Sequence, residues 1–478
     1  MGVGVSGWPL AQAVSRMGQL GVVSGTALAI ILVRRLQLGD PGGPMRRALR
    51  QFPFPPVAER VLDQYYIPGG KLPHEPFALQ PMPGVPLSAA LTELTVLANF
   101  VEVFLAKEGH DGLVGVNYLE KVQFPTLPSI YGAMLAGVDY MLMGAGVPRA
   151  IPGILDQLAR GEAVRLRIDV SDLPPGEQVV HEFDPHACFG SGPGLKRPLF
   201  LAIVSSATLA MTLARKSSGK VDGFIVEGPS AGGHNAPPRG PMHRNERGEP
   251  IYTDRDLPDL ERIRALGLPF WMAGSFAEPA QLAEALKLGA AGVQVGTAFA
   301  FCEESGLDPH LKRRVIEQVL SGNIEVLTDP LASPTGFPFK VVQLDGTLSE
   351  AATYERRERG CDLGYLRSAY RKPDGAIGYR CPAEPVQQYL RKGGQAADTC
   401  GRKCLCNGLL AAIGLGQAQA NGYLEKPLLT AGESVRHIAR FLRQDRRSYT
   451  AADVVHHLVD GLADRMNRMD GVAAAFLR

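Results

Sequence analysis

The sequence predicts an α/β protein built on a (β/α)8 barrel of the TIM type, followed by a C-terminal, mainly helical region. Over the first 304 residues, short and nearly all-apolar strand segments alternate with Ala- and Leu-rich helical segments. Strands that are apolar on both faces and alternate with helices are typical of a parallel sheet covered by helices. The number of repeats favours closure of that sheet into a barrel.

Seven segments carry the strand pattern, and most of them end at Gly, Ser or Asn. In chain order they are residues 21–25, 113–117, 140–144, 199–205, 224–228, 270–274 and 292–296. The clearest helical segments beside them are residues 9–17, 207–216 and 279–288.

The first strand of an eight-stranded barrel is not visible in the sequence. Residues 1–7 have the composition of a loop that follows a strand. We therefore expect the first strand to be missing from the chain as given, with the true start upstream of Met1.

The barrel is expected over residues 1–304 and the C-terminal region over residues 305–478. We expect three insertions in the barrel. Residues 34–86 are rich in Pro, Gly and Arg around a helical piece at 45–66, residues 164–196 predict a hairpin, and the polar residues 236–258 are expected to form a lid.

Composition excludes several classes of protein. The chain is 45% hydrophobic and 21% charged, with a net charge of +2, which gives no basic excess for nucleic acid. The most apolar N-terminal run, residues 20–33, is interrupted by Ser24, Gly25 and Thr26 and is too short to span a membrane. We expect a cytoplasmic protein with reduced thiols that binds neither nucleic acid nor a membrane.

The loop after the fifth strand segment carries the strongest local signal. Glu227 ends that strand, and Gly232 and Gly233 directly precede His234. Adjacent glycines allow close backbone approach to a ligand, and a histidine beside them can act as an acid or base near neutral pH. A plain turn with a solvated histidine is the alternative.

The last two strand ends have the pattern of a phosphate cradle. Gly274 precedes Ser275, and Gly296 precedes Thr297. Glycine permits close approach, the hydroxyls add donors, and barrels commonly bind phosphate at this place. Two capped helices without a ligand are the alternative.

These motifs together resemble the nitronate monooxygenase family, formerly called 2-nitropropane dioxygenases. The resemblance is carried by Gly-Gly-His at 232–234, by residues 271–275 and 290–297, by the opening residues 1–15 and by Gly-Val-Asn at 115–117. It covers about residues 1–300. The FMN-dependent enoyl-acyl-carrier reductases belong to the same superfamily.

The resemblance implies a barrel that binds FMN non-covalently, with His234 as catalytic base and the FMN phosphate at the cradle. The cofactor-binding residues that it implies are Met1, Gly2, Asn117, Glu227, Gly232, Gly233, Gly274, Ser275, Gln294, Gly296 and Thr297. It implies no metal. The chain departs from the family at Glu227, where Gln is usual, and at Ser230, where Glu is usual.

The activity implied is oxidation of alkyl nitronates by O2 to a carbonyl compound and nitrite. One alternative is an NAD(P)H-dependent FMN reductase acting on an enoyl thioester or a quinone. Another is a non-catalytic FMN-binding partner module. The assembly state, including a homodimer, stays open.

Two further features are left open by the sequence. Cys381, Cys400, Cys404 and Cys406 lack the C-x2-C spacing usual in zinc and iron–sulfur sites, so we expect reduced buried thiols or a loop over the site. Lys121 follows Asn117 by four residues and is expected either to reach the flavin or an anionic substrate, or to lie on the surface.

Overall fold

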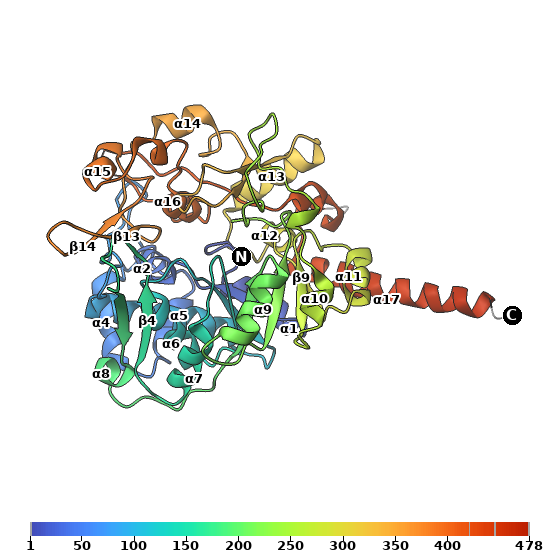
Figure 1. The fold of residues 1–478 in the computed structure, drawn as a ribbon, viewed down its shortest axis with the longest axis horizontal. Helices are drawn as coiled ribbons and strands as arrows, with labels where there is room; N and C mark the ends of the chain where they lie inside the picture. The colour runs from blue at the N-terminus through green and yellow to red at the C-terminus, as the bar shows by residue number, and fades with distance from the viewer. Residues whose placement is uncertain (1, 420, 444–445, 477–478) are drawn as a thin grey trace.

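A computed structural model describes residues 2–419, 421–443 and 446–476. It confirms an α/β fold around a curled, seven-stranded sheet (Figure 1). In spatial order the strands are β1 (Gly21–Ser24), β2 (Val114–Leu119), β3 (Tyr140–Gly144), β7 (Leu199–Val204), β8 (Gly223–Glu227), β9 (Phe270–Ala273) and β10 (Gly292–Gln294).

All seven predicted strand segments are confirmed, and every neighbouring pair runs parallel. Their side chains are mostly buried on both faces, as in β8, where Phe224, Ile225 and Val226 are at most 3% exposed. The curled sheet is TIM-barrel-like. Among the described residues, β1 and β10 are its two edges.

Helices that follow the strands pack on the outside of the sheet. Those of the barrel are α1 (Trp8–Arg16), α2 (Leu28–Gln37), α5 (Ala89–Lys107), α6 (Thr126–Leu135), α7 (Ile151–Ala159), α9 (Ala207–Lys216), α10 (Leu260–Arg264), α11 (Pro279–Lys287) and α12 (Thr297–Ala300). Among the described residues, α5 alone is long and apolar enough to cross a membrane, but most of it is buried against its neighbours in the core.

The three insertions are present, with one correction. The single helix expected at 45–66 is two helices, α3 (Pro44–Leu49) and α4 (Pro55–Tyr65), because Pro53 and Pro55 interrupt it. The predicted hairpin pairs β4 (Val164–Ile168) with β6 (Val179–Phe183), and α8 (Pro185–Phe189) follows it. The third insertion holds only a short 3-10 helix, Asp254–Asp256.

The C-terminal region contains strands that the expectation of a mainly helical region missed. One hairpin joins β11 (Glu325–Asp329) to β12 (Phe339–Gln343). Another joins β13 (Ser368–Arg371) to β14 (Ile377–Arg380), and β13 also pairs with β5 (Val170–Ser171) of the second insertion. These strands are only four or five residues long, apart from the two-residue β5, and do not alternate with helices as the barrel strands do.

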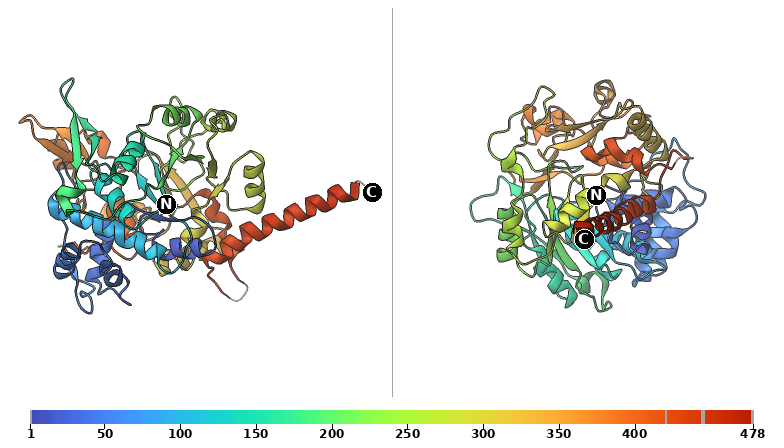
Figure 2. Two further views of the ribbon diagram at one scale, coloured as in Figure 1. Left: turned by 90° about the horizontal axis from the view of Figure 1, so that it is seen from below. Right: turned by 90° about the vertical axis from the view of Figure 1, so that its right-hand side faces the viewer.

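Several helices of this region lie on one side of the sheet, whereas another packs against α11 and α1 and then leaves the body of the molecule. The helices are α13 (Pro309–Leu320), α14 (Ala351–Arg356), α15 (Val386–Arg391), α16 (Leu405–Ala411) and α17 (Ala451–Phe476). Figure 1 shows α14, α15 and α16 together above the sheet, and Figure 2 shows α17 projecting toward the C-terminus.

A buried ion pair holds the C-terminal region together. The Arg357 guanidinium donates two hydrogen bonds, of 2.7 and 2.6 Å, to the carboxylate of Glu425, and both side chains are at most 4% exposed. Removing one partner of such a pair leaves an uncompensated buried charge.

We therefore expect Glu425→Gln to lower the free energy of unfolding by about 3–5 kcal/mol. Chemical denaturation of the purified full chain measures this. The matched control is Glu162→Gln in the exposed pair with Arg160, which should leave the denaturation midpoint unchanged. Equal effects of the two substitutions would contradict the prediction.

Candidate functional site

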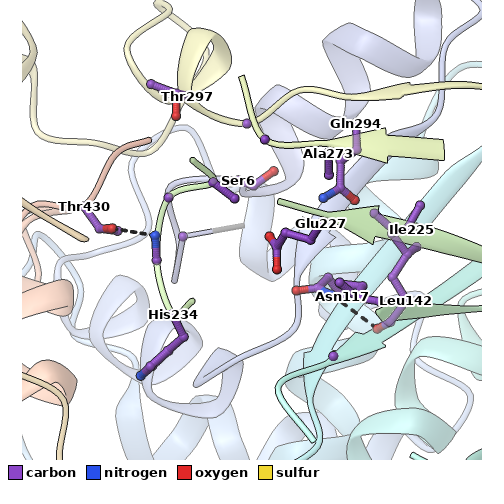
Figure 3. A pocket seen from close by; sticks show the side chains of 18 of the residues that line it. Ser6, Asn117, Leu142, Ile225, Glu227, His234, Ala273, Gln294, Thr297 and Thr430 are labelled. Carbon is purple, nitrogen blue, oxygen red and sulfur yellow. Dashed lines mark hydrogen bonds between the residues drawn. The ribbon is translucent and has the colours of Figure 1, made fainter. Parts of the chain in front are cut away.

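A cavity of about 950 Å³ lies at the carboxyl ends of the strands and is covered by the C-terminal region. Its lining combines strand residues, the loop after β8 and segments beyond residue 330. Figure 3 shows part of this lining. The predicted site residues Gly2, Asn117, Glu227, Gly232, Gly233, His234, Gly274, Ser275, Gln294, Gly296 and Thr297 all line it. Met1 lies outside the described residues.

Three polar side chains from separate strands lie close together in the cavity. Asn117, Glu227 and Gln294 extend from β2, β8 and β10 beside the apolar Leu142 and Ile225 (Figure 3). The Asn117 Nδ2 atom donates to the Leu142 carbonyl oxygen at 3.4 Å. Within the described chain, the buried Oε1 atom of Gln294 has no hydrogen-bond partner. Such a group favours a polar ligand at this place.

The charge state of Glu227 differs from that of an ordinary carboxylate. Burial raises the pKa of Glu227 to about 7. Near neutral pH the side chain is therefore protonated in a large fraction of molecules. In the protonated form it can donate a hydrogen bond, as the Gln usual in the family does.

The glycines before His234 serve packing as well as the cavity. A Cβ atom at Gly232 would lie 2.7 Å from the backbone nitrogen of Gly432. Gly233 has φ +84°, and its N–H donates to the Thr430 Oγ1 atom at 2.9 Å. The C-terminal backbone thus approaches closely at Gly232, while both glycines also line the cavity, so close approach of a ligand stays a prediction.

His234 is held by residues of the C-terminal region. Its Nε2 atom lies 2.7 Å from the Ser333 Oγ atom, and its ring packs edge-on against Phe339 with centroids 4.8 Å apart. The Ser333 hydroxyl in turn lies 2.8 Å from the Thr335 hydroxyl. His234 is thus part-buried and hydrogen-bonded, unlike the freely solvated histidine of the alternative interpretation.

Burial and the neighbouring Lys121 lower the pKa of His234 to about 3. Both causes favour the neutral imidazole near neutral pH. Burial also lowers the pKa of Lys121 to about 8. The Lys121 ammonium lies 3.1 Å from the centroid of the Phe337 ring and has no hydrogen-bond partner among the residues described. Lys121 is thus not a surface lysine.

The two halves of the predicted phosphate cradle differ. Gly274 and Ser275 both have positive φ, +97° and +59°, and the Ser275 Oγ atom is buried without a hydrogen-bond partner in the described structure. Ser275 does not cap α11, as the two-helix interpretation required, because Glu278 caps it ahead of Pro279.

Gly296 and Thr297 open the short helix α12. No atom lies within 4 Å of the Cβ position at Gly296, so its backbone faces open space. The Thr297 Oγ1 atom accepts the N–H of Gly432 at 2.8 Å, which leaves its own proton free to donate.

Sequence reasoning missed the residues of the C-terminal region that hold the histidine loop. Ser333, Phe339 and Thr430 position His234 and Gly233, yet no motif marks them in the sequence. Ser6 was also missed, and its hydroxyl donates to the Val22 carbonyl oxygen at 2.6 Å.

Comparison with known proteins gives one family match. Residues 196–330 match the family model of nitronate monooxygenase. This match confirms the resemblance predicted from the motifs, and it contains Glu227, His234, Ser275 and Thr297.

Two curated relatives match part of the chain. The chain is 27% identical over 213 residues to the (3aS,4S,5R,7aS)-5-hydroxy-7a-methyl-1-oxo-octahydro-1H-indene-4-carboxyl-CoA dehydrogenase of Mycobacterium tuberculosis, covering 41% of this chain and 56% of the relative. It is 29% identical over 185 residues to a nitronate monooxygenase of Paraburkholderia phytofirmans, covering 37% and 47%. The chain thus spans about half the length of these relatives.

A solved structure shares the fold over nearly the whole chain. The enoyl reductase domain of MlnA, from the macrolactin biosynthesis cluster of Bacillus amyloliquefaciens, has a TM-score of 0.50 at 12% identity. The match covers 99% of this chain and 94% of that chain. At this identity the similarity concerns the fold alone.

The lowered pKa of His234 predicts a specific loss of stability in acid. The unfolded state takes up a proton near pH 6.5, whereas the folded state resists protonation down to about pH 3. The pKa difference therefore destabilises the folded protein as the pH falls below 6.5.

Between pH 7 and pH 5, wild type should lose about 2 kcal/mol more stability than His234→Gln. Urea denaturation at the two pH values measures the difference. The matched control is the exposed His74→Gln, which should follow wild type. Parallel pH dependence of wild type and His234→Gln would contradict the buried, neutral state.

Proposed function

We propose, from the nitronate monooxygenase segment that this chain carries, that it is a flavin-dependent oxidoreductase that binds FMN in the cavity and oxidises alkyl nitronates. The observation that carries the proposal is the part-buried His234 on the cavity wall, hydrogen-bonded to Ser333, with the Lys121 ammonium close enough to lower its pKa. A neutral ring and a nearby cation suit an anionic substrate.

The residues present fit an FMN molecule. The unpartnered Ser275 Oγ atom and the open backbone at Gly296 suit a phosphate group. Thr297 and Gly274 line the same phosphate end of the cavity. Asn117, Glu227 and the unpartnered Gln294 suit the polar edge of a ring system. Bound FMN would supply the electron-transfer and oxygen chemistry.

The protein groups would bind and orient the substrate. The Lys121 ammonium would stabilise the negative charge of a nitronate, and the imidazole would hold the substrate by a hydrogen bond. With a neutral nitroalkane, a ring nitrogen of His234 would take the α-proton and leave the nitronate. The adjacent Ser333 and Thr335 hydroxyls offer that proton a hydrogen-bonded way out.

The low pKa of His234 also bears on substrate choice. A ring with a pKa of about 3 is a weak base, so removing a proton from a neutral nitroalkane costs more free energy than binding a preformed nitronate. We therefore propose that the nitronate is the preferred substrate.

A second candidate is an NAD(P)H-dependent reductase that acts on an enoyl thioester or a quinone. It is favoured by the apolar roof of the cavity, where Leu363, Tyr365 and Leu409 leave more apolar wall than a small nitronate requires. The relative from Mycobacterium tuberculosis is named as acting on a CoA ester, which agrees with this candidate. The cytoplasmic location and a homodimer stay predictions.

His234→Ala should retain FMN but lower oxygen consumption with nitroethane by about 100-fold, with a smaller loss for ethyl nitronate. Only the neutral substrate needs a base. Oxygen uptake with each substrate measures the ratio, and flavin absorbance checks the cofactor. Ser333→Ala, which removes the hydrogen-bond partner and keeps the ring, should fall between wild type and His234→Ala. Equal losses on both substrates would contradict the base assignment.

The two candidate functions separate in one experiment on purified yellow protein. We expect oxygen uptake with ethyl nitronate in the absence of any nucleotide. Oxidation of NADH or NADPH that depends on a crotonyl thioester or a quinone, with nitronate inert, would instead establish the reductase. Bound FMN without turnover in either assay would support the remaining alternative, a non-catalytic FMN-binding partner module.

A further inference from the structure

Four cysteines from separate parts of the C-terminal region surround one small cavity. Cys361 follows α14, Cys381 follows β14, and Cys404 and Cys406 lie at the start of α16. All four line the cavity, and none forms a disulfide. The sequence grouped Cys400 with three of these residues. In the structure Cys400 is exposed and does not line the cavity, while Cys361, which was not considered, does.

The four cysteines come from three separate segments of the C-terminal region and meet at this one cavity. Four cysteine thiols at one place are a complete ligand set for a metal group.

Two buried oxygens at the same cavity have no hydrogen-bond partner within the described chain. Glu384 is 2% exposed, and Lys392 holds its Oε2 atom at 2.7 Å while Oε1 is unpartnered. Asn407 is fully buried, with Nδ2 bound to Asp362 and near the Cys404 sulfur, while Oδ1 is unpartnered. The Lys392 ammonium already balances the charge of Glu384, so the two unpartnered oxygens mark a polar wall of this cavity.

The arrangement of the cysteines does not match a single-ion site. A zinc ion requires four sulfurs at about 2.3 Å from one point. Across the described residues, no three or more His, Cys, Asp or Glu groups are gathered closely enough to hold one ion. The four cysteines nevertheless line one cavity, and four thiolates are the usual ligand set of an iron–sulfur cluster.

We propose that Cys361, Cys381, Cys404 and Cys406 are the ligands of an iron–sulfur cluster. When a preformed cluster is transferred from four donor thiolates, four S–H bonds and four donor Fe–S bonds break, four Fe–S bonds to the cysteines form, and the four protons pass to the donor thiolates. Leu405 and Cys406 line both this cavity and the large one, so the cluster would lie directly behind the wall of the candidate flavin site. The proposal is independent of the proposed function, because it rests on thiols outside the nitronate monooxygenase segment.

The test begins with the full chain purified without oxygen. We expect iron and acid-labile sulfide in a [2Fe–2S] or [4Fe–4S] stoichiometry. After reduction, low-temperature EPR should show a cluster signal distinct from a flavin radical. Stoichiometric zinc, or no iron after reconstitution with ferrous iron and sulfide, would overturn the proposal. Disulfides among the four cysteines in the anaerobic protein would also overturn it.

Variants assign the ligands. Cys361→Ser and Cys381→Ser should each lower bound iron at least tenfold, whereas Cys400→Ser, the matched exposed control, should retain it. Iron retained by both ligand variants would overturn the assignment. If a variant misfolds, the iron and sulfide content of the wild-type protein still tests the proposal. Flavin content, measured separately, distinguishes failure of this proposal from failure of the proposed function.

Discussion

The site depends on backbone contact between the loop after β8 and a segment near residue 430. Gly233 donates to Thr430, Gly432 donates to Thr297, and Gly432 packs where any side chain at Gly232 would lie. On the other side, the Lys340 N–H donates to the Gly233 carbonyl oxygen at 2.9 Å. The loop that carries His234 therefore has its conformation only when the C-terminal region is docked on it.

Burial then sets the chemistry of the residues held there. The pKa values of His234, Glu227 and Lys121 are all moved toward the neutral form of each group, and burial is the largest cause in each case. A carboxyl, an imidazole and an amine are thereby brought nearer to an uncharged state in one apolar enclosure. In such surroundings a charge arriving with a ligand is screened little, so its interaction with Lys121 is strong.

The sequence predicted the sheet and most of the predicted site residues well, because both depend on local signals. Apolar strands such as 224–228 are recognisable one at a time, and the position of Asn117, Glu227 and Ser275 at one end follows from the parallel arrangement. What was missed depends on contacts between distant segments. No sequence spacing reveals that Ser333 and Thr430 contact the histidine loop. The same holds for Cys361 and Cys406, which line one cavity. The packing of Gly232 against Gly432 was likewise not visible, because the two residues are far apart in sequence.

The hydrogen bond from Gly233 to Thr430 joins residues 197 positions apart, which has a consequence for synthesis on the ribosome. At roughly 5–20 residues per second, the histidine loop emerges about 10–40 s before its docking partner is made. During this interval the nascent barrel carries an uncovered apolar mouth. Translation speed through the C-terminal region thus sets how long this mouth is accessible to chaperones, to other nascent chains and to an early-arriving cofactor.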